Sequence, residues 1–229
     1  MGNAYFQFKR FTVWHDKSAM KVGTDGVLLG AWCRVDGARK ALDIGTGSGL
    51  IALMMAQRNE ALEVLGIDID EDSVEQAKEN AIRSPFAQRL RFQQMDVGKM
   101  EGRHEFDVVV SNPPFYTADT ISPQMERGAA RNVKSLPFKL LMEKAVELMK
   151  EDGRFCVIIP YVEAPQFILN AASVGLSLSR RCDVKATPRK AYKRSLLEFG
   201  LHARESEFEE LVLNSEAFKK MVGDFYLDK

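Results

Sequence analysis

The stretch that decides the fold is Leu42-Asp43-Ile44-Gly45-Thr46-Gly47-Ser48-Gly49-Leu50. It joins a short apolar run, residues 40–44, to a segment with helical spacing of leucine and methionine, residues 50–55. Glycines between a strand and a helix allow a sharp turn and a close approach to a ligand, and the first N–H groups of the helix are free to bind it. By itself, the turn is also consistent with a tight connection that binds nothing.

A carboxylate follows at the end of the next expected strand, residues 62–68. Asp68 at this place can accept hydrogen bonds from both hydroxyls of a ribose. The dinucleotide fingerprint G-x-G-x-x-G requires a glycine where this chain has Leu50, which argues against NAD and against an oxidoreductase that uses it. The glycine turn and Asp68 together therefore predict a ribose-bearing cofactor other than NAD.

Short runs of valine, isoleucine and leucine alternate with helical segments from about residue 38 onward, which predicts βαβ units and an α/β fold. We expect a mostly parallel seven-stranded sheet with helices on both faces and an antiparallel hairpin near the C-terminus. The expected strands are residues 40–44, 62–68, 90–95, 106–110, 155–159, 176–184 and 195–202. Four expected helices cover residues 25–32, 50–55, 162–172 and 205–221. A further helix is capped by Asp70 or Asp72 and runs through residues 74–82, and another is opened by Ser135 and Pro137, runs through residues 140–148 and is closed by Gly153.

One domain, residues 1–229, accounts for the whole chain. We divide it into an N-terminal arm with a short helix (1–37), a core (38–204) and a C-terminal helix (205–229). Residues 112–134 contain few periodic apolar positions and are expected to form a long loop, which in a compact domain is usually functional.

The composition excludes several classes of protein. With 45% hydrophobic residues, and 32 basic against 32 acidic residues, the chain is globular and carries no overall basic field, so a nucleic-acid surface would have to be local. It has no apolar run of membrane-spanning length. Its three cysteines lie far apart in apolar stretches, and with three histidines they show no metal-ligand spacing. We therefore expect a cytoplasmic protein with no disulfide and no metal.

The glycine turn, Asp68 and the later Asp96 resemble the first three motifs of the class I methyltransferases, which use S-adenosylmethionine. The resemblance implies a Rossmann-like fold, with S-adenosylhomocysteine as the product of the cofactor. It also implies the cofactor contacts. The turn, with Asp43, Gly45, Gly47 and Gly49, lies under the methionine part. Asp68 binds the ribose, Ile69 packs on the adenine, Asp96 takes its amino group, and Val97 belongs to the same cofactor site. Judged from the residues alone, Asp96 is equally a capping residue before a turn.

The segment Asn112-Pro113-Pro114-Phe115 follows the expected strand at residues 106–110. Two prolines fix an extended backbone that lacks N–H donors, and the segment therefore offers acceptors beside an aromatic ring. An exocyclic amino nitrogen is a poor nucleophile because its lone pair is delocalised into the ring. We assign the Asn112 side-chain oxygen and the Pro113 carbonyl as acceptors from this amino group, with Phe115 stacking on the base and the rate coming from alignment.

The same segment resembles the motif of methyltransferases that act on planar nitrogen. Their substrates are adenine N6, guanine N2 in RNA and glutamine N5 in protein, so the motif does not choose among them. Residues 20–32, residues 6–11 and His15-Asp16 resemble the bacterial tRNA adenine-N6 methyltransferases that modify valine tRNA. This second resemblance implies methylation of the adenosine on the 3′ side of the anticodon. It also places Thr24 and Asp25 over the methionine end of the cofactor, with Asp25 near the ammonium group; both are also suitable helix caps.

A tRNA substrate requires a local basic surface. Residues 180–194 contain seven basic residues and one acidic residue, and a second basic edge lies on the expected long loop. The residues that we assign to RNA binding are Lys185, Arg189, Lys190, Lys193 and Arg194, with Arg127, Arg131 and Lys134 on the loop. A charged loop with no partner is the alternative. A cofactor-binding RNA module without catalysis is the remaining functional alternative, which turnover would exclude.

Overall fold

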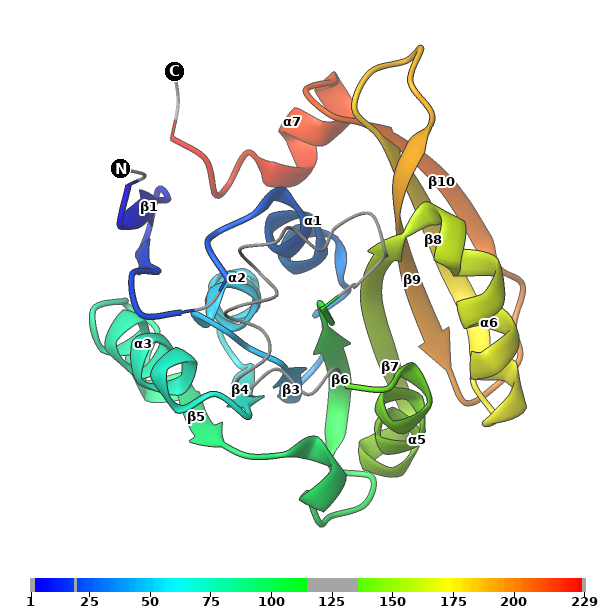
Figure 1. Cartoon of the computed structure of the whole chain (residues 1–229), viewed down its shortest axis with the longest axis horizontal. Helices are drawn as coiled ribbons and strands as arrows, with labels where there is room; N and C mark the ends of the chain where they lie inside the picture. Colours follow the sequence, from blue (N-terminus) through cyan, green and yellow to red (C-terminus); the bar gives the residue numbers. More distant parts are fainter. Residues whose placement is uncertain (1–2, 19, 115–135, 228–229) are drawn as a thin grey trace, which may run out of the picture.

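The computed structural model describes residues 3–18, 20–114 and 136–227. Eight strands form one sheet in the order β10-β8-β9-β7-β6-β3-β4-β5 (Figure 1). Strand β9 runs antiparallel to β7 and β8, and the other pairs in this sheet are parallel. The strands are β3 (Lys40–Ile44), β4 (Glu63–Asp68), β5 (Leu90–Gln94), β6 (Phe106–Ser111), β7 (Met149–Pro160), β8 (Ser177–Lys185), β9 (Tyr192–Gly200) and β10 (Glu207–Val212).

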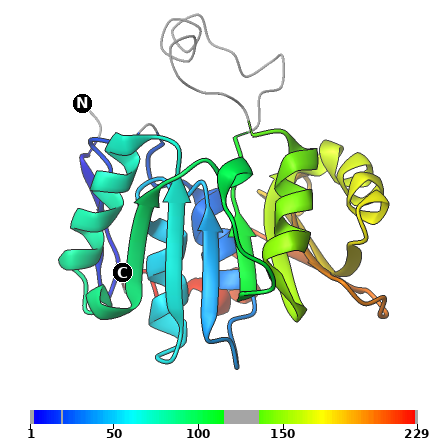
Figure 2. The same ribbon diagram turned by 90° about the horizontal axis from the view of Figure 1, so that it is seen from below.

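Helices cover both faces of the sheet, as the alternating pattern predicts (Figures 1 and 2). One face packs against α1 (Thr24–Trp32), α2 (Leu50–Arg58), α3 (Glu71–Ile82) and α7 (Glu216–Val222). The other face packs against α5 (Phe138–Leu148) and α6 (Ala164–Ser173). The central strand β6 supplies both cores: Val108 and Val110 point to the first, and Val109 to the second. A strand buried on both faces is continuously apolar, which explains the run of valines.

The N-terminal arm is a small hairpin of β1 (Tyr5–Gln7) and β2 (Thr12–Trp14), in keeping with the expected extended segment. It lies against the C-terminal end of the chain. The Lys9 amide donates to the Phe225 carbonyl at 2.7 Å, and the rings of Phe8 and Tyr226 stack with centroids 6.0 Å apart. The two described ends of the chain are therefore fastened to each other.

The expected helix at residues 205–221 is wrong in its first half, where β10 adds an eighth strand to the expected seven. Only α7 is helical there. The helical spacing of Phe208, Leu211 and Phe218 favours one amphipathic helix, but residues 207–212 pair in parallel with β8 instead. Partners distant in sequence stabilise this edge strand, because Glu207 and Glu209 each reach an arginine from another element. Tertiary pairing has overridden the local pattern.

A second correction concerns the connection after α5. The sequence predicts that Gly153 closes that helix, but α5 ends at Leu148 and β7 begins directly at Met149. Gly153 lies inside β7, where the pairing with β6 shifts its register. A side chain there would come within 3.0 Å of the Phe106 carbonyl oxygen, so the glycine permits this close approach of the two strands.

No helix in the described part of the chain is long and apolar enough to cross a membrane. Cys33, Cys156 and Cys182 are free and buried. Within the described ranges, no group of three or more histidine, cysteine, aspartate or glutamate residues is arranged to hold a metal ion.

Candidate active site at the carboxyl edge of the sheet

The candidate site follows from the direction of the parallel strands. Strands β3, β4 and β6 end at the same edge, and β3 lies between the other two. The chain leaves β3 toward α2 on one face of the sheet, whereas α5, the next described element after β6, packs on the second face (Figure 2). Ligands of open α/β sheets bind at such a switch point, beyond the carboxyl ends of the strands. The sequence-predicted residues from Asp43 to Asn112 lie at or just beyond the carboxyl ends of β3, β4, β5 and β6.

The glycine turn has the backbone that only glycine adopts readily. Gly45, Gly47 and Gly49 have φ angles of 72°, 53° and 81°, all in the left-handed region. The amides of Gly45 and Thr46 donate to the Ile67 carbonyl at 2.9 and 3.0 Å, which fixes the turn against the end of β4. No described atom lies within 4 Å of the position a Cβ of Gly45 would take, so one side of the turn is open to a ligand.

Asp68 binds the glycine turn through its carboxylate. One oxygen accepts from the Gly47 amide at 2.9 Å, and the other accepts from the Asp70 amide at 3.0 Å. Burial raises the pKa of Asp68, and no cation in the described ranges pairs with it. Each carboxylate oxygen can accept more than one hydrogen bond, and the group therefore retains capacity for hydroxyl donors of a ligand.

Asp43 is fully buried at the end of β3 and lacks a complete set of partners. Its Oδ2 accepts from the Thr46 hydroxyl at 2.7 Å, whereas its Oδ1 has no hydrogen-bond partner in the described structure. Burial raises the pKa of Asp43 to about 7. Asp43 therefore has capacity for a further hydrogen-bond donor.

The residues assigned to adenine lie beyond β4 and β5. Ile69 follows Asp68 directly and is 47% exposed, so its side chain is accessible to a ligand at the end of β4. Asp96 accepts from the Gly98 amide at 2.9 Å and thereby caps a short 3-10 helix, residues 97–99. The capping interpretation of Asp96 is therefore confirmed as a contact of the ligand-free chain. Val97 is buried in the second core.

The acceptor segment begins directly after β6. Ser111 is buried, and its hydroxyl donates to the Ile44 carbonyl at 2.9 Å, which fastens the end of β6 to the residue before Gly45. Asn112 and Pro114 are partly exposed, and Pro113 is buried. The Ser111 bond places the backbone of Asn112 next to the beginning of the glycine turn. The remaining residue of this motif, Phe115, lies outside the described residues, as do Arg127, Arg131 and Lys134.

Thr24 and Asp25 begin α1 but do not cap it. The N-cap position is Gly23, which has no side chain to cap with, so the helix-cap alternative for these two residues is wrong. Asp25 instead forms an ion pair with Arg194 of β9, with Nε to Oδ2 at 2.7 Å. The structure therefore joins a residue assigned to the cofactor with a residue assigned to RNA.

The basic segment 180–194 is less basic on its surface than in sequence. Four of its seven cations have carboxylate partners: Arg180 with Glu198, Arg181 with Asp183, Lys185 with Glu210 and Arg194 with Asp25. Three cations remain exposed without a partner in the described structure, namely Arg189, Lys190 and Lys193. They lie at the hairpin between β8 and β9, which extends beyond the carboxyl edge.

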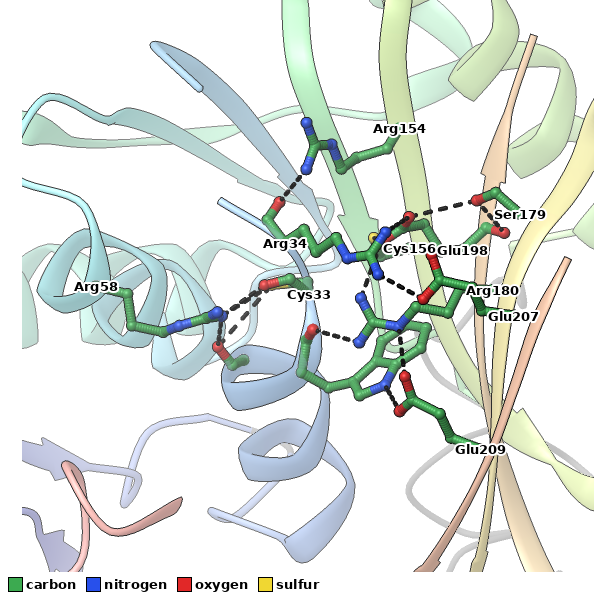
Figure 3. A network of polar contacts seen from close by, with 12 residues as sticks. Cys33, Arg34, Arg58, Arg154, Cys156, Ser179, Arg180, Glu198, Glu207 and Glu209 are labelled. Atoms are coloured by element: carbon green, nitrogen blue, oxygen red, sulfur yellow. Dashed lines mark hydrogen bonds and ion pairs between the residues drawn. The ribbon is translucent and has the colours of Figure 1, made fainter. Parts of the chain in front are cut away.

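Arg180 is the centre of a buried polar network (Figure 3). Its guanidinium lies 3.7 Å over the Trp32 ring and donates to the Trp32 carbonyl at 3.0 Å. It also reaches Glu198 at 3.5 Å and Glu209 at 3.4 Å. Arg180 is one of the seven basic residues of segment 180–194, but it is only 6% exposed. Its guanidinium contacts the protein interior and does not contribute to a basic surface.

Asn80 is a residue of the site that sequence reasoning missed. Its side chain is fully buried on α3 and donates to the Ser48 carbonyl of the glycine turn at 2.9 Å and to the Trp14 carbonyl at 2.8 Å. The amide of Trp14 donates back to the Asn80 oxygen at 2.9 Å. Asn80 thus connects the N-terminal arm with the glycine turn, and nothing in its sequence neighbourhood signals that contact.

A family model described as a methyltransferase domain matches residues 36–221. A relative from Bacteroides thetaiotaomicron, described as a tRNA1(Val) (adenine(37)-N6)-methyltransferase, is 41% identical over 99% of both chains. A relative of the same description from Phocaeicola vulgatus is 42% identical over the full length of both. Among solved structures, a predicted O-methyltransferase from Agrobacterium tumefaciens has a TM-score of 0.64 at 21% identity and covers 88% of this chain and 94% of that one. This last likeness concerns the fold alone.

Proposed function

Because the chain belongs to the methyltransferase-domain family, and within it to the tRNA1(Val) (adenine(37)-N6)-methyltransferases, we propose that it transfers a methyl group from S-adenosylmethionine to N6 of an adenine in tRNA. The target is the adenosine on the 3′ side of the anticodon of valine tRNA. A tRNA substrate places the enzyme in the cytoplasm. One observation carries the proposal: the Ser111 bond to the Ile44 carbonyl holds the Asn112 segment beside the glycine turn. The two cores share one sheet, which supports a single catalytic domain.

The described residues fit S-adenosylmethionine. This cofactor carries two positive charges, and the edge offers two carboxyl groups, Asp43 and Asp68, that no cation of the described chain pairs with. Asp68 would bind the ribose, and the exposed Ile69 would pack on the adenine. Asp96 would accept a hydrogen bond from the adenine amino group. Gly45, Gly47 and Gly49 let the backbone approach the methionine part. When bound, the cofactor supplies an electrophilic methyl group.

Asn112 and Pro113 act on the nucleophile. The adenine amino group donates its two hydrogens to the Asn112 side-chain oxygen and the Pro113 carbonyl, which favours a pyramidal nitrogen and directs its lone pair toward the methyl group. Phe115 stacks on the base and Pro114 fixes the backbone between them. The nitrogen loses its proton after the transfer, so the mechanism needs positioning and no strong base.

The hairpin between β8 and β9 contacts the RNA backbone. Its exposed Arg189, Lys190 and Lys193 are available to phosphates, whereas Lys185 is paired with Glu210 and Arg194 with Asp25. Arg127, Arg131 and Lys134 form the second proposed contact. An unstacked anticodon-loop base reaches the acceptors without opening a duplex.

Identification of the methylated nucleoside tests this proposal. The protein is incubated with unmodified valine tRNA and labelled S-adenosylmethionine, and the RNA is digested and analysed by mass spectrometry. N6-methyladenosine is the expected product. N2-methylguanosine would retain the site and change the substrate, label on protein glutamine would move the substrate to another class, and cofactor binding without any product would leave an RNA-binding module.

The variant Asn112→Ala tests whether Asn112 acts on the base or on the cofactor. We expect its methylation rate to fall by at least about a hundredfold, the scale on which removal of one aligned polar group affects a transfer reaction, while its dissociation constant for S-adenosylmethionine stays within about twofold. Calorimetry measures the binding and the nucleoside assay measures the rate. A strong decrease of cofactor affinity in this variant would contradict the assignment of Asn112 to the base.

A further inference from the structure

The ion pair between Asp25 and Arg194 joins parts of the chain that are 169 residues apart in sequence. Arg194 Nε donates to Asp25 Oδ2 at 2.7 Å, and the two side chains are 35% and 28% exposed. The arginine also donates to the Lys193 carbonyl at 3.0 Å, which holds the guanidinium against its own strand. A partly shielded pair with a fixed donor loses less side-chain freedom than two mobile surface charges do.

The pair lies at the carboxyl edge of the sheet. Arg194 pairs in register with Pro160, the last residue of β7, and β7 runs parallel to β6. Asp25 occupies the first turn of α1, on the face of the sheet that also carries α2. The two charges therefore meet beside the strand ends that hold the glycine turn and Asn112.

Helix α1 connects this ion pair to the glycine turn. A Cβ at Gly26 would come within 2.9 Å of the Leu50 side chain, and a Cβ at Gly30 within 2.8 Å of the Met54 sulfur, so α1 and α2 pack in close contact along one row of small residues. Leu50 is the first residue of α2 and directly follows Gly49. A displacement of the first turn of α1 would therefore move the side chain that packs at the end of the glycine turn.

We propose that Arg194 is a positioning residue for the cofactor site and not a phosphate ligand. Its ion pair with Asp25 holds the first turn of α1 against Leu50 and fixes the carboxylate of Asp25 beside the glycine turn. The inference rests on the proposed function in one respect, because it takes this edge as the S-adenosylmethionine site. It separates Arg194 from Lys193, its neighbour on β9, which is exposed and has no partner in the described structure.

Calorimetric titration of S-adenosylmethionine into wild type and Arg194→Gln tests the assignment, with tRNA affinity measured in parallel. We expect Arg194→Gln to weaken cofactor binding about threefold to fivefold, the scale of a partly exposed ion pair. Arg34→Gln, measured alongside, breaks the partly exposed pair of an arginine with Glu207 and should leave cofactor binding unchanged. In steady-state assays the KM for the cofactor should rise by the same factor while kcat at saturating cofactor stays close to the wild-type value. Arg194→Lys should recover part of the affinity.

A double-mutant cycle identifies the partner. Asp25→Asn with Arg194→Gln should bind the cofactor no more weakly than Asp25→Asn alone, because the second change removes a group whose partner is already gone. Melting temperatures of all variants show whether weaker binding reflects general unfolding. Unchanged cofactor affinity in Arg194→Gln, or additive effects in the double variant, would overturn the inference while the proposed function stands. Failure of the wild type to bind S-adenosylmethionine would instead overturn both.

Discussion

Acidic side chains at the two ends of the sheet have different kinds of partner. At the β3–β4 end, the carboxyl groups of Asp43 and Asp68 have only hydroxyl and amide donors, and burial raises the pKa of each. At the β8–β10 end, Glu198, Glu207 and Glu210 each lie next to a cation. The three glutamates pair with cations of the chain itself and so contribute to the fold. Asp43 and Asp68 have no cationic partner among the described residues and are available to a cationic ligand.

The pKa values express the same contrast. The Arg34 guanidinium lowers the pKa of Glu207, and hydrogen bonds from Tyr192 and Lys185 lower that of Glu210. The pKa values of Asp43 and Asp68 move in the opposite direction because desolvation exceeds their hydrogen bonds. A region in which the ionised form is disfavoured in the free protein gains the most from a bound cation.

Glu198→Gln should give a large decrease in stability. Arg180 and Glu198 are both nearly buried, so removing the charge of Glu198 leaves a buried guanidinium with the half-exposed Glu209 as its remaining carboxylate. We expect the free energy of unfolding, measured by urea denaturation, to fall by about 3 kcal/mol, with no change in cofactor affinity of the folded protein.

Glu207→Gln is the matched control for this change. Its pair with Arg34 is short, 2.6 Å, but both side chains are about half exposed. The expected cost is below about 1 kcal/mol. Equal decreases in the two variants would show that burial does not set the value of these pairs, and the contrast between the two ends would lose its energetic basis.

Asp68→Asn should have the reverse signature. An amide can accept from only one of the two backbone donors and offers no negative charge, so we expect the dissociation constant for S-adenosylmethionine to rise about tenfold while the unfolding free energy falls by only about 1 kcal/mol, the cost of one unpaired N–H. Asp70→Asn makes the same chemical change two residues later, where the side chain caps α3 and asparagine caps equally well. Its cofactor affinity should match the wild type. A strongly destabilised Asp68→Asn with normal affinity would make Asp68 a structural acid.

Asp43 makes the contrast visible as a pH dependence. Its pKa is about 7 in the folded protein against 3.8 for the free carboxyl group, so between these values the folded state holds a proton that the unfolded state has released. The stability of the cofactor-free protein that Asp43 contributes is complete below about pH 4 and is lost as the pH rises to about 7. The slope is at most about 1.4 kcal/mol per pH unit.

Asp43→Asn should remove this contribution. Urea denaturation of both proteins at a series of pH values, from about pH 4 to about pH 8, gives the difference between their unfolding free energies. This difference should fall steadily as the pH rises and become constant above about pH 7. Parallel curves across the whole range would mean that Asp43 is ionised in the folded state and has a partner.

The β3–β4 end could be predicted from sequence because its chemistry is local. Each candidate residue there lies at or just beyond the carboxyl end of a strand, and parallel strands bring those ends together whatever the rest of the chain does. Gly45, Asp68 and Asn112 are placed in this way. The alternation of strand and helix also predicts α2, α3, α5 and α6, each of which comes after a strand of the sheet.

At the β8–β10 end the sequence predicts the antiparallel hairpin of β8 and β9, but it does not predict the ion pairs, because these depend on the register of the two strands and on the position of β10. Glu198 meets Arg180 only because β9 lies beside β8, and Glu209 reaches the same arginine only because β10 is a strand. The sum of charges along residues 180–194 therefore exceeds the free basic surface. The contact between Asp25 and Arg194 is hidden for the same reason, since each residue alone has a plausible but different partner.

The three cations that remain unpaired at the β8–β10 end give the smallest expected effect. When Arg189→Gln, Lys190→Gln and Lys193→Gln are combined, the tRNA dissociation constant should rise several-fold at low salt. The slope of its logarithm against the logarithm of salt concentration should fall by about 0.7 to 0.9 for each phosphate that the variant no longer binds. Cofactor affinity should stay unchanged.

Arg39→Gln with Lys40→Gln is the matched control for the hairpin variant. These two exposed cations lie at the opposite edge of the sheet, where β3 begins, and their replacement should keep the wild-type slope. If both variants flatten the slope equally, RNA responds to the total charge of the protein. If only the hairpin variant flattens the slope, the hairpin between β8 and β9 is the RNA contact. The carboxylates at the β8–β10 end then pair with the other cations and leave these three available to phosphates.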